Sequence, residues 1–180
     1  DVLITYIAEL NHNKNHLFLL RNWKSILQYA PNVHCLIVGK GENEEALRRY
    51  VEQNGLQHIH FLGFRHDIPI ILSDSDIVTL LSFREGLPRC VMEAMASKKP
   101  LVVTNIRGSR DLVQHGVNGF VIDLGDDRTL TESFVKLIRE PNLREQMGQA
   151  SFERIQPYRL ENVLAEMDGV YSRYVSSAGD

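Results

Sequence analysis

Short runs of aliphatic and β-branched residues alternate along this chain with longer stretches whose apolar residues have helical spacing. The strand-like runs are continuously apolar, as at residues 36–38 and 77–78, which is typical of strands covered on both faces of a sheet. No hairpin signal joins two consecutive runs, so each strand is expected to reach the next through a right-handed helical crossover. The sequence therefore predicts an α/β, Rossmann-like three-layer sandwich with a six-stranded parallel sheet.

The predicted elements alternate until the last helices. Strands are expected at residues 2–8, 33–38, 59–62, 76–82, 101–104 and 119–123. Helices are expected at residues 19–30, 46–51, 68–72, 90–97, 111–114, 129–139, 143–155 and 160–174. Ligands bind such sheets beyond the carboxyl ends of the strands. The candidate site segments are therefore residues 9–15, 39–42, 63–67, 82–89 and 105–110.

Composition excludes several classes of protein. Apolar residues make up 43% of the 180 residues and charged residues 24%, which is close to the average of soluble globular proteins and unlike a disordered chain. The formal net charge of −3 gives no sign of the basic surface that nucleic-acid-binding proteins carry, so no nucleic-acid partner is expected. No apolar run reaches the roughly 18 residues that a membrane span needs.

Cysteine and histidine spacing predicts no metal site. Cys35 and Cys90 have no partner at metal-ligand spacing, so we expect two buried, reduced thiols, as in a reducing compartment. His58 and His60 lie two residues apart but have no third ligand in view.

The chain begins at Asp1 with a strand-like run and without the pattern of a signal peptide. We expect a fragment of a longer protein, cut at a domain boundary. Residues 1–175 are expected to form one domain and residues 176–180 a frayed tail.

Two carboxylates mark the segment after the fourth predicted strand. Glu85 lies in the loop, and Glu93 follows with seven residues between them, about one turn into the next helix. Gly86 and the helix N-terminus between them can present backbone N–H groups, which favour an anion such as phosphate. Carboxylates instead accept hydrogen bonds from hydroxyl groups. The segment therefore predicts a ligand that combines phosphate with several hydroxyls, which describes a nucleotide sugar.

The Glu-x7-Glu motif resembles the signature of the carboxyl-terminal, donor-binding domain of retaining GT-B glycosyltransferases, family 4 or group 1. The chain is similar to the bacterial capsule and exopolysaccharide transferases of that family. Further family-like segments follow in the same order, at residues 36–41, 60–64, 75–78, 93–96, 99–103 and 115–120. The resemblance covers roughly residues 2–174.

The resemblance implies one half of a GT-B fold, with the N-terminal acceptor domain absent. It implies a nucleoside-diphosphate sugar donor, most often UDP-linked, and hexosyl transfer to a saccharide or lipid-linked acceptor in polysaccharide biosynthesis. No metal or other cofactor is implied. The implied location is the cytoplasm, with contact to the inner membrane through the missing half. Because a GT-B active site lies between the two halves, this fragment alone is expected to be inactive. The last helix is expected to pack on the missing half and to expose its apolar face here.

The resemblance also implies roles for individual residues. Glu93 would accept the ribose hydroxyls. Two residues are expected to be catalytic: Glu85 would face the donor sugar, and Lys14 would neutralise the diphosphate and assist its departure. The remaining donor-binding positions would act largely through the backbone, around the base, sugar and diphosphate. They are Gly39, Phe64, Arg65, His66, Gly86, Leu87, Arg89 and Cys90.

One position departs from the family pattern. Where the family usually has Gly-Arg-Leu, this chain has Ala-Glu-Leu, so Glu9 occupies the place of an arginine on the diphosphate. A carboxylate repels a diphosphate unless it is paired. Glu9 therefore either pairs with Lys14 or points away, and Arg89, Arg107 or Arg110 is expected to supply the missing charge.

Two alternatives remain open. The chain could be a non-catalytic nucleotide-binding subunit of a split transferase, or belong to another GT-B enzyme such as a nucleotide-sugar epimerase. An NAD-linked oxidoreductase is disfavoured, because no glycine fingerprint follows the first strand.

Overall fold

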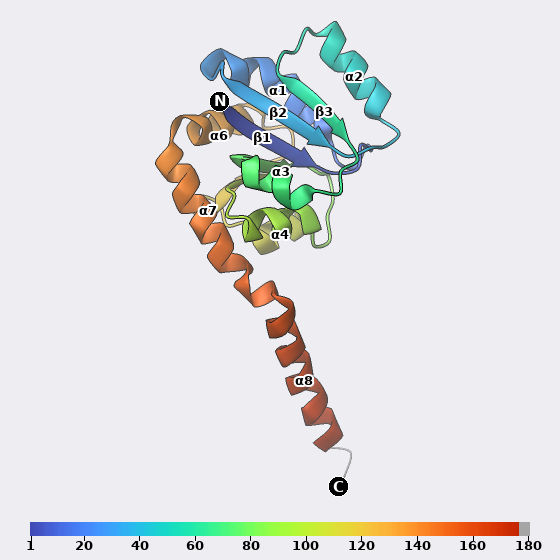
Figure 1. Cartoon of the computed structure of the whole chain (residues 1–180), viewed down its shortest axis with the longest axis vertical. Helices are drawn as coiled ribbons and strands as arrows, with labels where there is room; N and C mark the ends of the chain where they lie inside the picture. The colour runs from blue at the N-terminus through green and yellow to red at the C-terminus, as the bar shows by residue number, and fades with distance from the viewer. Residues whose placement is uncertain (177–180) are drawn as a thin grey trace.

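Six parallel strands form one sheet in the computed structural model, which describes residues 1–176 (Figure 1). The strands are β1 (Val2–Ile7), β2 (Val33–Val38), β3 (Ile59–Gly63), β4 (Ile77–Leu80), β5 (Leu101–Thr104) and β6 (Gly119–Ile122). Their order across the sheet is β3-β2-β1-β4-β5-β6, and every neighbouring pair is parallel. The predicted α/β, Rossmann-like fold is confirmed.

Helices cover both faces of this sheet (Figure 1). One face carries α1 (His16–Tyr29), α2 (Glu44–Gln53) and α6 (Asp127–Arg139). The other carries α3 (Ile68–Asp74), α4 (Arg89–Ala96) and α5 (Arg107–Leu112). Helix α7 (Pro141–Ile155) contacts both α6 and α4. After the short 3₁₀ turn η1 (Gln156–Tyr158), α8 (Leu160–Ser176) extends away from the sheet (Figure 1).

The core fixes the central strands against α1. Every residue of β4 and β5 is buried, as the continuous apolar runs predict. Helix α1 buries one face, on which Phe18, Trp23 and Ile26 are almost inaccessible to solvent. Fully burying one such side chain contributes about 1.5–3 kcal/mol, so the start of α1, and the loop before it, are held firmly beside β1.

The order in which the chain adds strands to the sheet reverses next to β1. The chain runs from β1 outward to β2 and β3, and then returns to place β4 on the other side of β1. The loops after β1 and β4 therefore both begin at the carboxyl end of the sheet, and they lead to helices on opposite faces, α1 and α4. In open α/β sheets such a switch point is where ligands bind.

Among the predicted bounds that the structure changes are those of β4 and α5. Strand β4 ends at Leu80, because the N–H of Leu81 donates to the hydroxyl of Tyr6 (2.8 Å) rather than continuing the strand. The prediction of a helix at residues 111–114 is wrong, since α5 spans Arg107–Leu112. Its buried Gly108 packs against the loop after β4, at Gly86. Val113 has an extended backbone, so the helix ends at Leu112.

The end of the chain is described only in part. Ser176 is the last residue of α8, and the rest of the tail predicted to be frayed, residues 177–180, lies outside the described residues. Within residues 1–176, no helix combines the length and the apolar character that crossing a membrane requires.

Candidate functional site

The loops after β1 and β4 are hydrogen-bonded to each other along their length. The side-chain amide of Asn15 donates to the carbonyl of Leu81 (3.1 Å). The N–H of Phe83 donates to the carbonyl of Asn13 (2.9 Å), whose side-chain amide donates to the carbonyl of Arg84 (2.9 Å). We refer to these two segments, residues 13–15 and 81–85, as the loop clamp. They are distant in sequence and meet because β1 and β4 are neighbours in the sheet.

Lys14 and Glu85 form an ion pair within the loop clamp. The Lys14 Nζ lies 2.5 Å from the Glu85 Oε1, and the two side chains are only 21% and 11% exposed. Charges largely withdrawn from water interact more strongly than an exposed pair. A lysine ammonium has three N–H donors, so Lys14 can hold Glu85 and still meet an anion. The structure thus brings together the two residues that the sequence predicts to be catalytic.

Glu9 does not pair with Lys14. Its exposed carboxylate accepts a hydrogen bond from the side-chain amide of Asn11 (2.9 Å). The Asn11 Oδ1 in turn accepts from the backbone N–H of Lys14 (3.1 Å). Of the two arrangements expected for Glu9, pairing with Lys14 is therefore wrong.

The N-terminus of α4 offers free backbone donors after the loop clamp. The first hydrogen bonds into this helix run from Val91 and Met92 to the carbonyl of Pro88 (3.1 and 3.2 Å). The N–H groups of Arg89 and Cys90 precede them and have no partner within the helix. Such groups, together with the helix dipole, favour an anion. Gly86 and Leu87, which lead into this turn, are exposed.

Glu93 lies on the first turns of α4 with a partly exposed carboxylate. Its side chain is 43% exposed, and its Oε1 lies 3.8 Å from the Nη2 of Arg89. Because the Arg89 side chain is 89% exposed, this pair leaves Glu93 open to a ligand. Of the other two candidate cations, Arg107 is exposed, and Arg110 donates to the side chain of Asn105 (2.9 Å). Which arginine supplies the missing charge stays a prediction.

Gly39 joins the end of β2 to the loop after β1. Its N–H donates to the carbonyl of Gly63 at the end of β3 (2.8 Å). Its φ is +144°, and a Cβ here would lie 1.9 Å from the carbonyl oxygen of Ala8. Only glycine fits, so the close approach of these backbones explains Gly39 without a ligand.

The loop after β3 is exposed at the same edge of the sheet. Phe64 is 63% exposed and meets His66 edge-on, with ring centroids 4.9 Å apart. Arg65 forms a bidentate pair with Asp67 (2.8 and 2.5 Å), and this hydrogen bonding lowers the pKa of Asp67. The segment presents an aromatic side chain and backbone groups to solvent.

Two buried residues that the sequence analysis missed lie beneath the loop clamp. The fully buried Tyr6 donates its hydroxyl to the carbonyl of Lys14 and accepts from the N–H of Leu81. His16 is 2% exposed and stacks on the Tyr6 ring at 4.1 Å, and neither of its ring nitrogens has a hydrogen-bond partner among the described residues. Burial lowers the pKa of His16 to about 4. A tyrosine within a mostly aliphatic strand signals a buried hydroxyl that needs a partner, but nothing in the sequence singles out His16.

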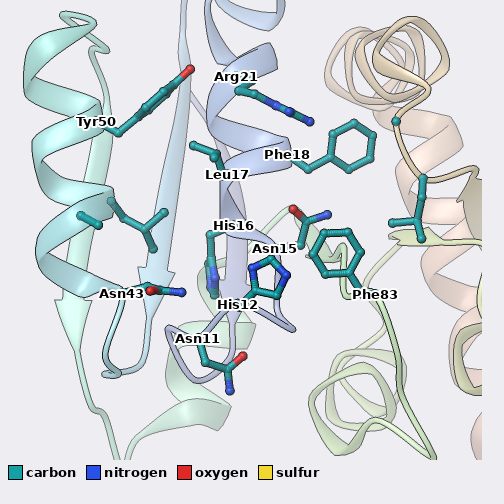
Figure 2. Close-up of a pocket in the computed structure, with 14 residues that line it drawn as sticks. Asn11, His12, Asn15, His16, Leu17, Phe18, Arg21, Asn43, Tyr50 and Phe83 are labelled. Carbon is teal, nitrogen blue, oxygen red and sulfur yellow. The ribbon is translucent and has the colours of Figure 1, made fainter.

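A pocket of about 620 Å³ adjoins the loop clamp (Figure 2). Its volume is in the range of small-molecule sites. His12 stacks on Phe83 at one rim (5.1 Å between ring centroids), and Asn43 and Arg21 face the opening from the α2 and α1 sides. None of the residues predicted for donor binding lines this pocket.

The cysteines and histidines add no metal centre. Among residues 1–176, no group of three or more His, Cys, Asp or Glu residues is arranged to hold a metal ion. His34 stacks on His58 and on His60, with ring centroids 4.5 and 5.3 Å apart. Both cysteines are free: Cys35 is buried, whereas Cys90 is half-buried, and burial raises the pKa of Cys90 to about 11.

Comparison with known families settles the membership of the chain. The sequence pattern of the family described as glycosyl transferases group 1 matches residues 1–154. The chain belongs to the glycosyl transferases group 1 family. The fold and the Glu-x7-Glu segment therefore belong to a group 1 glycosyl transferase domain.

Relatives of this glycosyl transferase domain come from several bacteria. The Bacillus subtilis protein EpsD, which carries the name of a glycosyltransferase, is 31% identical over 176 residues, covering 97% of the chain and 46% of EpsD. An Escherichia coli UDP-Gal:α-D-GlcNAc-diphosphoundecaprenol α-1,3-galactosyltransferase is 32% identical over 139 residues, covering 75% of the chain and 36% of the relative. The chain thus spans about half or less of the length of these curated relatives.

Solved structures share the fold of the domain. HepE from Anabaena, in complex with UDP-glucose, superposes with a TM-score of 0.83 at 26% identity, covering 98% of this chain and 49% of HepE. TarM from Staphylococcus aureus, in a complex that contains UDP, superposes with a TM-score of 0.88 at 22% identity, covering 94% of this chain and 35% of TarM. These GT-B transferases carry the same α/β domain.

Proposed function

We propose that this domain binds the nucleoside-diphosphate sugar of a retaining glycosyltransferase, and that the donor is UDP-linked. The observation that carries the proposal is the meeting of Lys14 and Glu85 at the switch point of the sheet, beside the free amides of α4. A cation and backbone donors suit a diphosphate, and a carboxylate next to them suits sugar hydroxyls.

Each part of the donor has a candidate partner. Lys14 and the amides of Arg89 and Cys90 face the diphosphate, and Glu85 accepts hydrogen bonds from the sugar. Glu93 accepts the ribose hydroxyls, and the exposed loop after β3 holds the base. In transfer, negative charge grows on the departing diphosphate, so fixed positive groups there are expected to supply most of the catalysis. The chemistry proposed needs no metal or other cofactor.

The relatives support UDP and a role in polysaccharide synthesis. The name of the Escherichia coli relative specifies a UDP-sugar and a lipid-linked diphosphate acceptor, and HepE was solved with UDP-glucose. A Staphylococcus aureus relative, CapM, is named for capsular polysaccharide biosynthesis. We therefore propose hexosyl transfer to a saccharide or lipid-linked acceptor at the cytoplasmic side of the inner membrane.

The whole enzyme is proposed to need a second half. The chain covers about half of the length of its relatives. The Lys14–Glu85 site lies at the carboxyl end of the sheet. A further domain would supply the acceptor site and pack on the apolar face of α8. The chain alone is then expected to bind donor and to transfer little or no sugar.

Glu9 favours one alternative, a nucleotide-binding domain that takes no part in transfer. An exposed carboxylate lies where the family usually has an arginine. Sugar transfer by the longer protein, lost when Lys14 is replaced by methionine, would contradict this alternative.

Calorimetric titration with UDP, GDP and ADP tests the proposed function. We expect saturable binding of UDP, weakened about tenfold or more by Glu93→Gln, because hydrogen bonds to a charged group contribute about 1.5–3 kcal/mol. The matched control is Glu145→Gln on α7, an exposed glutamate outside the site. Preference for GDP or ADP would contradict the assignment of UDP. Absence of nucleotide binding by both the chain and the longer protein would contradict the donor site itself.

A further inference from the structure

Tyr6 contacts both loops of the loop clamp from beneath. Its ring is fully buried in β1. The hydroxyl donates to the carbonyl of Lys14, eight residues later, and accepts from the N–H of Leu81 (2.8 Å), 75 residues later. One hydroxyl therefore connects the backbone of Lys14 to the backbone immediately after β4.

The donor and acceptor roles of this hydroxyl are fixed. A backbone N–H can only donate and a carbonyl can only accept, so the phenol oxygen serves Leu81 and the phenol hydrogen serves Lys14. Burial raises the pKa of Tyr6 well above its ordinary value, which keeps the proton on the hydroxyl. The hydroxyl therefore stays protonated at neutral pH, and the connection keeps one orientation.

The Tyr6 ring is itself held in place. His16, the first residue of α1, stacks on it with ring centroids 4.1 Å apart and an interplanar angle of 27°. Asn15, immediately before His16, adopts a left-handed conformation (φ 48°, ψ 40°) and directs its amide to the carbonyl of Leu81. The position of the hydroxyl thus follows from the packing of β1 against α1.

Lys14 is consequently held at three points. Its N–H donates to Asn11 (3.1 Å), its carbonyl accepts from Tyr6, and its ammonium meets Glu85 (2.5 Å). A lysine side chain is long and flexible, and ordering it during binding costs free energy. Fixing its backbone beside the loop that carries Glu85 lowers that cost.

We propose that Tyr6 is a positioning residue for the donor diphosphate: its hydroxyl holds Lys14 against the loop after β4, so that the ammonium is in place before the donor binds. This inference rests on the proposed function. Tyr6 is buried and acts only through Lys14.

The test compares UDP with uridine, which lacks the diphosphate. We expect Tyr6→Phe to weaken UDP binding about threefold to tenfold, the effect of one hydrogen bond, and to leave uridine binding unchanged. In a Lys14→Met background the same substitution should leave UDP binding unchanged within about twofold, because coupled residues are not additive. The control is Tyr29→Phe, whose exposed ring lies at the end of α1.

Each contrary outcome has a distinct meaning. Equal losses for UDP and uridine would show that Tyr6 supports the fold in general and would overturn the inference, as would an undiminished effect in the Lys14→Met background. Failure of both the unsubstituted chain and the longer protein to bind UDP, GDP or ADP would overturn the proposed function, and the inference with it, before any variant is examined.

A second variant covers the case in which Tyr6→Phe does not fold. Asn13→Ala removes an exposed hydrogen bond between the same loops, from the Asn13 side-chain amide to the carbonyl of Arg84. A loss confined to UDP supports positioning of Lys14 by the loop clamp, and unchanged UDP binding overturns it.

Discussion

At the scale of single residues, His16 is a buried imidazole whose protonation opposes folding. Burial, with a smaller contribution from Lys14, lowers its pKa from 6.5 to about 4. Below pH 6.5 the unfolded chain therefore takes up this proton more readily than the folded one. The stability of the fold with an uncharged His16 is fully present above pH 6.5 and is lost as the pH falls toward 4. We expect a decrease of about 2 kcal/mol in the free energy of unfolding between pH 7 and pH 5 from this residue.

Urea unfolding at the two pH values measures this contribution. His16→Phe keeps an aromatic ring on Tyr6 but cannot titrate, so its stability should fall less by that amount. His34 and His60, whose pKa values burial also lowers, are present in both proteins and cancel. An equal pH dependence of the two proteins would contradict the prediction.

The proximity of two single residues could be predicted where a motif and the sheet topology act together. Lys14 and Glu85 are 71 residues apart, yet each follows a strand, and the two strands are neighbours. The partner of Glu9 was not predictable, because Asn11 and Lys14 both lie within reach along the chain and only the turn of the loop selects between them. Tyr6 was missed because its role depends on Leu81, which no local pattern connects to it.

At the scale of elements, α5 supports the loop after β4 by close backbone contact. A Cβ on Gly108 would lie 1.9 Å from the carbonyl oxygen of Gly86 and 2.8 Å from that of Glu85. Gly108→Ala must therefore displace the segment between the two glutamates. We expect it to lower the free energy of unfolding by about 1–3 kcal/mol and to weaken UDP binding, as measured by thermal melting and calorimetry.

Gly148→Ala is a matched control for this steric effect. Its Cβ would lie 2.2 Å from the carbonyl oxygen of Lys98, beyond the other end of α4. A similar loss of stability is expected there, with UDP binding unchanged. Equal effects of both variants on UDP would contradict a specific contact between α5 and the loop.

Elements were predictable where their own residues decide them. The six strands were found because continuous apolar runs are hard to place elsewhere than in a covered sheet. Helix α6 begins two residues earlier than expected because Asp126 caps it, accepting from the N–H of Thr129 (2.9 Å). Helix α5 was misplaced because Gly108 is a poor helix former, and packing on Gly86 determines its conformation.

At the scale of the whole molecule, α8 is an element whose apolar face is left uncovered by the part of the chain that the structure describes. It extends away from the sheet (Figure 1), and its apolar residues are unusually exposed. The exposed fractions are 71% for Leu160, 38% for Val163, 52% for Leu164, 45% for Met167 and 63% for Tyr171. The sequence predicts this face from helical spacing, and the proposed second half would cover it.

An exposed apolar helix face of this kind favours association between copies. We expect the purified chain to self-associate with rising concentration in sedimentation velocity, and Leu164→Glu with Met167→Glu to shift it to monomer. Asn162→Glu with Ala165→Glu places the same charges on the opposite face of α8 and should leave association unchanged.

In the longer protein, where a second half is proposed to cover the apolar face of α8, Leu164→Glu with Met167→Glu should instead lower the melting temperature. A chain that stays monomeric at every concentration without substitution would contradict the prediction, and UDP binding should be the same in all three proteins because α8 lies apart from the loop clamp.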